Sequence, residues 1–366
     1  MFRRIALSNC KSSSVLSRVS QLRYSFNRTS LQSSIIRREN HSPSSEACDA
    51  PPSPNSPPVQ DNAAVITIWT LAAVGTIYTT CAVFENLNLK KETPKVITLF
   101  YRDKENAYDL RRNVHEIRYL PGLYSPTTWP PVNQLFTPEG RQKFWGRLLP
   151  AEKFTYTIMG MNIGIHALGG LVPRLWSNIF MHVPGSNRNF TLLTCVFGHT
   201  SLMHLGFNMY AFNSFMPALG QDLIFHSSIA HMAAFYLSTG VISSWAQALS
   251  GGLRPSVPNI PFLGASGALF ALVGATAMEH PEAKFRIMLI PYDFAAQELL
   301  GVAMLFDLLG IFGAYKTLRL GHAAHLSGAL LGLGYVHFEC DKKIWQPLCR
   351  RVYKWSGMSK WEDRIK

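Results

Sequence analysis

Residues 262–278 read FLGASGALFALVGATAM and residues 321–338 read GHAAHLSGALLGLGYVHF, two runs without a single Lys, Arg, Asp or Glu. A membrane-spanning helix needs about 20 mostly apolar residues to cross a hydrocarbon core of about 30 Å, and both runs are close to that length. Because a segment in lipid must satisfy its own backbone hydrogen bonds, such runs predict helices. They also contain Ser266 and His325, polar side chains that are costly to place in a bilayer.

Five further runs have the same apolar character. They lie at 63–84, 155–173, 199–220, 228–250 and 295–315. The sequence therefore predicts an all-α polytopic membrane protein, with a six-helix core over residues 154–340 and one extra N-terminal transmembrane helix at 63–84, a one-plus-six arrangement. Small residues predicted to let the core helices approach closely are Gly160, Gly164, Gly267, Gly274, Gly328 and Gly332.

The positive charge of the chain is concentrated at its start. The sequence has 35 Lys and Arg against 22 Asp and Glu, a formal net charge of +13, and such an excess can indicate a nucleic-acid partner. Residues 1–38, however, are rich in Ser and Arg and contain no acid. This composition is typical of a mitochondrial transit peptide, with a basic disordered tail as the competing interpretation. We therefore expect no nucleic-acid partner.

Three more segments lie outside the predicted transmembrane helices. Residues 39–62 are rich in Pro and Ser, which predicts a flexible linker. Residues 85–153 form a polar inter-helix segment, in which 106–119 is a candidate short surface helix, and residues 341–366 form a basic C-terminal tail. The six cysteines include no CxxC pair, so we expect neither a disulfide framework nor a zinc site.

Ser266 stands at the start of a predicted helix, between Gly264 and Gly267. The glycines leave its backbone open to a substrate, and the first N–H groups of a helix lack intrahelical acceptors, so they can receive an oxyanion. A serine becomes a nucleophile when a base takes its proton, and histidine suits that role near neutral pH. His325 is the candidate base. Taken singly, each residue also fits simple packing or hydrogen bonding between helices.

His204 and Asn208 are four residues apart and therefore share one face of a predicted helix. Both can donate hydrogen bonds, as a tetrahedral intermediate requires, or they can serve as polar contacts between helices. Two acids, Glu298 and Asp307, fall in the run 295–315. We assign Asp307 a structural hydrogen-bonding role and Glu298 a place near a membrane face, with a catalytic role for neither.

Together these motifs resemble those of the rhomboid intramembrane proteases. The resemblance rests on Gly264-Ala265-Ser266-Gly267, on Ala324-His325-Leu326-Ser327-Gly328 and on the stretch from His199 to Asn208, and it covers about residues 155–338. The extra N-terminal helix and the transit-like leader are similar to the mitochondrial, presenilin-associated rhomboid-like branch.

The resemblance implies an intramembrane serine endopeptidase with a Ser266–His325 dyad and no third acid. It implies an oxyanion site made by the Ser266 N–H, His204 and Asn208, with no cofactor and no metal. It also implies single-pass transmembrane substrates in the mitochondrial inner membrane, where the chain itself would be a multi-pass protein within the lipid bilayer. One departure is Phe270, where bacterial members often carry a Tyr that stacks on the base.

Other function classes remain open from the sequence. The main alternative is a catalytically silent rhomboid-like protein that binds membrane clients, and the presence of both Ser266 and His325 argues against it. A seven-helix transporter would be expected to show a repeat or an intramembrane basic residue, and neither is visible. His322 and His325 could ligate a metal, but no third ligand with suitable spacing is evident.

The charges of the short loops predict an orientation. A transit peptide enters the matrix first, and the loops at 174–198, 251–261 and 316–320 contain five bases and no acid. Both observations favour an N-terminus in the matrix, a C-terminus in the intermembrane space and an active site that opens toward the matrix. The tail at 341–366, with eight bases and three acids, favours the opposite orientation.

Overall fold

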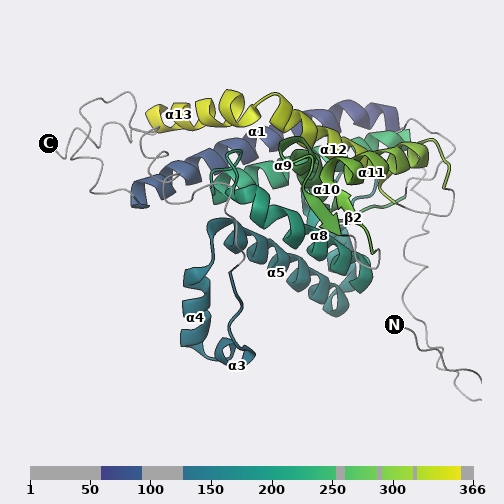
Figure 1. Cartoon of the computed structure of the whole chain (residues 1–366). Helices are drawn as coiled ribbons and strands as arrows, with labels where there is room; N and C mark the ends of the chain where they lie inside the picture. The colour runs from purple at the N-terminus through teal and green to yellow at the C-terminus, as the bar shows by residue number, and fades with distance from the viewer. Residues whose placement is uncertain (1–58, 93–126, 253–259, 287–290, 316–319, 356–366) are drawn as a thin grey trace, which may run out of the picture. The chain divides into compact units, whose positions relative to one another are not determined.

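Residues 59–92, 127–252, 260–286, 291–315 and 320–355 are described by a computed structural model, drawn in Figure 1. The predicted transit peptide (1–38), nearly all of the predicted linker (39–62) and the candidate surface helix (106–119) lie outside the described residues.

Each of the seven apolar runs contains a helix. These helices are α1 (Val59–Glu92), α5 (Pro150–Leu171), α8 (Leu202–Gln221), α9 (Ile229–Gly252), α10 (Ser266–Glu279), α11 (Ala296–Ile311) and α12 (His322–His337). Within the described part of the chain, one helical segment, Ala63–Asn88 of α1, passes a test of length and hydropathy for crossing a membrane, and α10 is a shorter apolar helix. The structure is mostly helical, as predicted, and the one-plus-six membrane arrangement stays a prediction.

Shorter elements connect these helices. They are α3 (Val132–Leu135), α4 (Pro138–Arg147), α6 (Pro173–Phe180), α7 (Thr191–Thr194), η2 (Cys195–Phe197), β1 (Lys284–Arg286), β2 (Asp293–Ala295), η3 (Asp341–Trp345) and α13 (Gln346–Trp355). The two strands pair antiparallel between α10 and α11, a small departure from the all-α prediction. Arg286 joins them with two hydrogen bonds, of 2.8 and 2.9 Å, to the carboxylate of Asp293. Phe285 stacks on Phe215, so the hairpin lies against α8.

The first turn of α5 is closed by Glu152, a fully buried acid. Its carboxylate accepts hydrogen bonds from the N–H and the hydroxyl of Thr127, at 2.7 and 2.6 Å, and from the N–H of Leu149 at 2.9 Å. These donors compensate for the burial of a charge, and an acid in the first turn suits the positive end of the helix dipole. The predicted polar segment 85–153 is thus tied to the start of the core.

Close contact between α10 and α12 depends on glycine. A Cβ added to Gly328 would run into the carbonyl group of Gly267, and one added to Gly332 would run into that of Ala271. Because no side chain stands between the two backbones, the helices approach more closely than larger residues would allow. This contact brings the first turns of α10 and α12 side by side.

The prediction of close approach is wrong for two of the six glycines. Gly160 and Gly164 lie on the exposed side of α5, and a Cβ added to either would meet nothing within 4 Å. A helix surface free of neighbours does not need glycine, so these positions have no packing role in the described structure.

The helix α1 packs along α9 and α13, as Figure 1 shows. Trp245 of α9 donates from its indole N–H to Thr67 Oγ1 at 2.9 Å. Asn86 donates from Nδ2 to the carbonyl oxygen of Cys349 in α13 at 3.1 Å, and both residues are buried. Part of the predicted basic tail at 341–366 is therefore helical and packed against the N-terminal helix.

Candidate active site

Ser266 and His325 lie at two helix N-termini that meet side by side. Ser266 is the first residue of α10, and His325 belongs to the first turn of α12. Their Oγ and Nε2 atoms are 2.8 Å apart, which is the separation of a hydrogen bond between a hydroxyl and an imidazole. The structure thus brings the predicted nucleophile and the predicted base into direct contact.

The ring of His325 is held by Phe270, which lies one turn after Ser266 on α10. The two rings are stacked, with centroids 4.3 Å apart and planes at 4° to each other. The His325 side chain is only 12% exposed. Because packing fixes the plane of the imidazole, its Nε2 is directed at Ser266 Oγ. The phenylalanine at this position therefore keeps the ring contact that the family resemblance implies for a tyrosine.

The backbone before Ser266 needs a glycine at position 264. Gly264 has a φ of +133°, a conformation that L side chains rarely adopt. A Cβ there would also stand 2.9 Å from the ring atoms Cε1 and Nε2 of His204. The N–H of Gly264 donates to the carbonyl oxygen of Cys195 at 2.9 Å, which ties the entry of α10 to the segment that precedes α8.

The first turn of α10 presents backbone donors next to Ser266 Oγ. The N–H of Leu269 is bonded back to the carbonyl oxygen of Ala265, at 3.0 Å. The N–H groups that precede it in a helix have no intrahelical acceptor. The N–H of Ser266 is one of these, so a backbone donor is available beside the hydroxyl of the predicted nucleophile.

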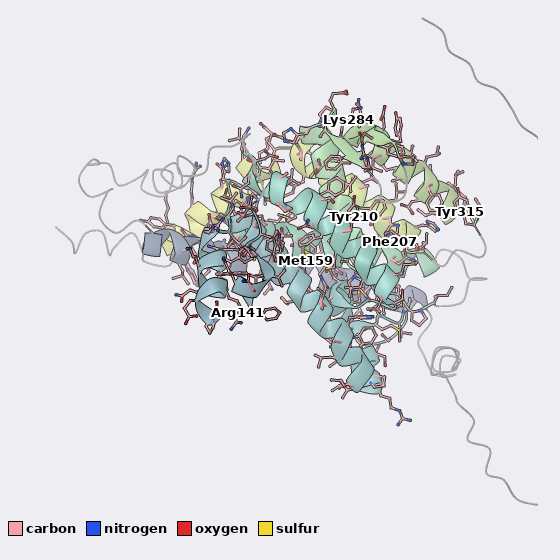
Figure 2. The ribbon with its side chains drawn as sticks, turned by 60° about the horizontal axis from the view of Figure 1, so that its bottom comes forward. Arg141, Met159, Phe207, Tyr210, Lys284 and Tyr315 are labelled. Atoms are coloured by element: carbon pink, nitrogen blue, oxygen red, sulfur yellow. The ribbon has the colours of Figure 1, made fainter. Side chains whose placement is uncertain are left out.

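His204 and Asn208 lie on the inward face of α8, where Asn208 is 6% exposed. Phe207 and Tyr210, by contrast, lie on the exposed face of the same helix (Figure 2). The ring of His204 lies next to Gly264, two residues before Ser266. The Nδ2 atom of Asn208 is buried without an acceptor. A buried donor without a partner is costly, and a substrate oxyanion would satisfy it.

Asp307 enters this site, although the sequence indicated only a structural role for it. Its Oδ1 is 3.1 Å from Nδ1 of His325 and 2.7 Å from Nδ1 of His322. Sequence reasoning did not find this contact, since it depends on the rotation of α11 about its axis. Glu298, the other acid of α11, accepts from the N–H of Ala295 at 2.8 Å and caps the helix.

The arrangement of His322 and His325 differs from that of metal ligands. Both rings direct Nδ1 at one oxygen of Asp307, at hydrogen-bond distances. Among the described residues, no group of three or more His, Cys, Asp or Glu is placed to hold a metal ion. These three residues are therefore best described as a hydrogen-bonded cluster behind Ser266.

Comparisons with known proteins find a family domain that covers this site. A family model, the rhomboid domain, matches residues 186–342, which include all the residues of the site. The mitochondrial presenilin-associated rhomboid-like protein of Homo sapiens is 30% identical over 236 residues, or 60% of this chain and 59% of that protein. The mitochondrial presenilin-associated rhomboid-like protein A of Danio rerio is 25% identical over 307 residues, or 80% of this chain and 75% of that protein.

A further relative comes from yeast. The mitochondrial rhomboid protein 1 of Saccharomyces cerevisiae is 25% identical over 192 residues, or 50% of this chain and 52% of that protein. The chain spans about 59% of the length of the mammalian relatives that it matches. The match to the rhomboid domain over residues 186–342 and the similarity to these relatives support a place for the chain in the mitochondrial branch of the rhomboid family.

Proposed function

We propose that this protein is an intramembrane serine endopeptidase of the mitochondrial inner membrane. The observation that carries the proposal is the 2.8 Å contact between Ser266 Oγ and His325 Nε2, at the N-termini of two apolar helices. The rhomboid domain and the mitochondrial relatives support a rhomboid-type protease or a related protein in a mitochondrial membrane. The inner membrane and the multi-pass topology are part of the proposal.

The proposed reaction proceeds by acyl transfer to Ser266. The hydroxyl oxygen attacks the carbonyl carbon of the scissile peptide while its proton passes to Nε2 of His325. The resulting oxyanion accepts hydrogen bonds from the Ser266 N–H, His204 and Asn208. The C–N bond then breaks, and the proton on His325 moves to the leaving amine. Water repeats the sequence on the acyl-enzyme, which releases the carboxylic acid and restores Ser266.

The proposed substrates are transmembrane segments of single-pass proteins. In a helix the backbone carbonyls are bonded to N–H groups four residues later, so a serine reaches them only after the helix opens locally. Gly or Pro near the cut lowers that cost by about 1 and 3 kcal/mol respectively, relative to Ala. We therefore expect cleavage at helix-weakening positions, and no cofactor is needed for any step.

The test uses purified protein with a fluorophosphonate probe and a reporter whose single transmembrane segment contains a Gly-Pro pair. Wild type is expected to label and to cleave, whereas Ser266→Ala and His325→Ala do neither while they remain folded. The double variant should be no worse than either single one, because the two residues act as a unit.

Ser327→Ala is the matched control. In wild type the hydroxyl of Ser327 lies on α12, close to His325 in sequence, but it donates to the carbonyl oxygen of Ala324 at 3.1 Å. This variant should label like wild type. Cleavage by pure Ser266→Ala protein would contradict the assignment of the nucleophile. An unlabelled wild type that still binds the reporter would instead favour the catalytically silent, client-binding alternative.

A further inference from the structure

Residues 127–149 form an arm in front of α5 that contains α3 and α4 and lies outside the stretch that matches the rhomboid domain. Thr137 Oγ1 accepts from the N–H of Gly140 at 3.1 Å, which caps the start of α4. Arg141 donates from Nη1 to the carbonyl oxygen of Phe136, at 3.2 Å. These bonds hold α3 and α4 together, so the arm behaves as one unit.

The arm is fixed to the start of α5, as Figure 1 shows. The ring of Trp129 packs against Phe144 of α4 and Tyr156 of α5, with centroids 4.9 and 5.5 Å apart. At the other end of this contact, the carboxylate of Glu152 accepts both hydrogen bonds from Thr127. The position of the arm is therefore set by where α5 begins.

The arm exposes large apolar side chains. Four of them are between 47% and 78% exposed: Trp129, Val132, Phe136 and Trp145. A protein surface in water rarely gathers so many large apolar groups within so short a segment. Tryptophan is enriched where a membrane meets water, because its ring is apolar and its N–H is polar. The composition of this surface is thus that of a segment at a membrane interface.

The same arm carries positive charge. Arg141, Lys143 and Arg147 of α4 are exposed, and the acid of the arm is Glu139 alone. None of the three bases forms an ion pair with another described residue. Figure 2 shows Arg141 on this surface, away from Tyr210 of α8. A base next to a membrane that contains anionic phospholipids strengthens binding about fivefold.

The position of the arm agrees with its composition. α4 ends at Arg147 and α5 begins at Pro150, so the arm directly precedes a helix that the proposed function places in the membrane. A chain that enters a bilayer first passes the polar headgroup layer, and the arm lies at that level. Exposed apolar side chains continue along α5, at Met161, Ile163, Leu168 and Leu171. The continuity with α5 favours lipid over an acidic protein as the partner of the bases.

We propose that the arm at 127–149 is an interfacial anchor that binds anionic phospholipid. The bases of α4 contact headgroup phosphates, while the rings of Phe136 and Trp145 lie among the headgroups. The anchor fixes the level at which α5 enters the membrane. This inference rests on the membrane location in the proposed function and is independent of the Ser–His chemistry.

The test uses full-length protein in lipid nanodiscs, with a bimane fluorophore attached through Gln142→Cys, an exposed position on α4. The protein without this cysteine gives the background from native thiols. A nitroxide on the headgroup of a tracer lipid quenches bimane on contact, and the ratio of quenched to unquenched fluorophore measures docking of the arm. We expect a higher ratio in nanodiscs of phosphatidylcholine with phosphatidylglycerol than in phosphatidylcholine alone.

The variants remove charge without touching the bonds within the arm. Lys143→Gln combined with Arg147→Gln should lower the ratio in phosphatidylglycerol by about 25-fold, or fivefold for each base. Lys284→Gln is the matched control, because it removes an exposed base of β1, and it should keep the wild-type ratio. Trp145→Ala should lower the ratio alike in both lipids, since the ring carries no charge. Thermal unfolding checks that each variant is folded.

Wild type alone also tests the charge, should a variant fail to fold. At about 1 M salt the Debye length is about 3 Å, so the preference for phosphatidylglycerol should disappear. A preference that survives this salt would overturn the inference, as would a Lys143→Gln, Arg147→Gln protein that docks like Lys284→Gln. Quenching by neither lipid, with a change of fluorescence on adding polyglutamate, would assign the surface to an acidic protein and also overturn it.

Fluorophosphonate labelling separates this inference from the proposed function. A wild type that labels while its arm stays undocked would refute the anchor and keep the protease. A wild type whose arm docks on anionic lipid without any labelling would refute the protease and keep the anchor.

Discussion

A close backbone contact between α10 and α12 offers a sharp test of the proposed site. Gly328 of α12 lies over the carbonyl group of Gly267, the residue after Ser266. A Cβ at position 328 would be 3.0 Å from the carbonyl carbon, with the oxygen nearer still, and 3.3 Å from Cβ of Phe270. Non-bonded carbon atoms pack at about 3.5–4.0 Å, so Gly328→Ala should force α10 and α12 apart by roughly 1 Å.

This displacement acts directly on the Ser266–His325 contact. Opening a separation of 2.8 Å by about 1 Å breaks the hydrogen bond, and a misplacement of that size costs about 10²-fold in rate. The effect on stability is smaller. Overpacking costs about 1–3 kcal/mol, and replacing a helical Gly by Ala returns about 1 kcal/mol. Gly328→Ala should therefore lose activity well before it loses its fold.

Gly160→Ala is the matched control, since it makes the same chemical change on α5 where nothing lies within 4 Å. It should keep full activity and melt at or above the wild-type temperature. The measurements are the fluorophosphonate labelling rate and thermal unfolding followed by tryptophan fluorescence in detergent. A Gly328→Ala protein that labels at the wild-type rate and melts like Gly160→Ala would refute the argument, because α10 and α12 would then have room to spare.

Three further predictions concern the oxyanion donors, metals and topology. His204→Ala and Asn208→Ala should each lower kcat by about 10²–10³ without unfolding the protein, and unchanged turnover in both would return them to a structural role. Prolonged dialysis against a chelator should leave the labelling rate unchanged, since Ser–His chemistry needs no metal; loss of labelling with rescue by zinc would revive the metal interpretation of His322 and His325. In mitoplasts, a tag at residue 366 should be digested by added protease, and its protection would place the active site toward the intermembrane space.

The helices could be predicted because a long apolar run is compatible with few structures other than a helix. Seven runs without charge, or nearly so, each contain a helix in the structure. Ser266 and His325 could be singled out as candidates as well, because each residue is unusual in an apolar run and both stand near a helix start. What the family resemblance added was the expectation that these two residues meet.

The parts that escaped prediction depend on rotation and pairing, which composition does not determine. Asp307 contacts His325 only because α11 presents that side to α12. The strands β1 and β2 have three residues each, too few for an alternating pattern to be visible. The helix α13 was not predicted, because attention to the basic charge of the tail left the helical spacing of its buried residues unnoticed. These residues are Cys349, Val352 and Tyr353.

The pairing of α1 with α13 has a consequence for how the protein is made. Asn86 and Cys349, which join the two helices, are 263 residues apart in the sequence. Contacts of such long range form late, because the intervening chain must first be ordered. During synthesis, α1 therefore leaves the ribosome long before its C-terminal partner has been made. A chain interrupted before α13 would leave that side of α1, with the amide of Asn86, without its partner, so the C-terminal helix completes a surface that the rest of the fold leaves open.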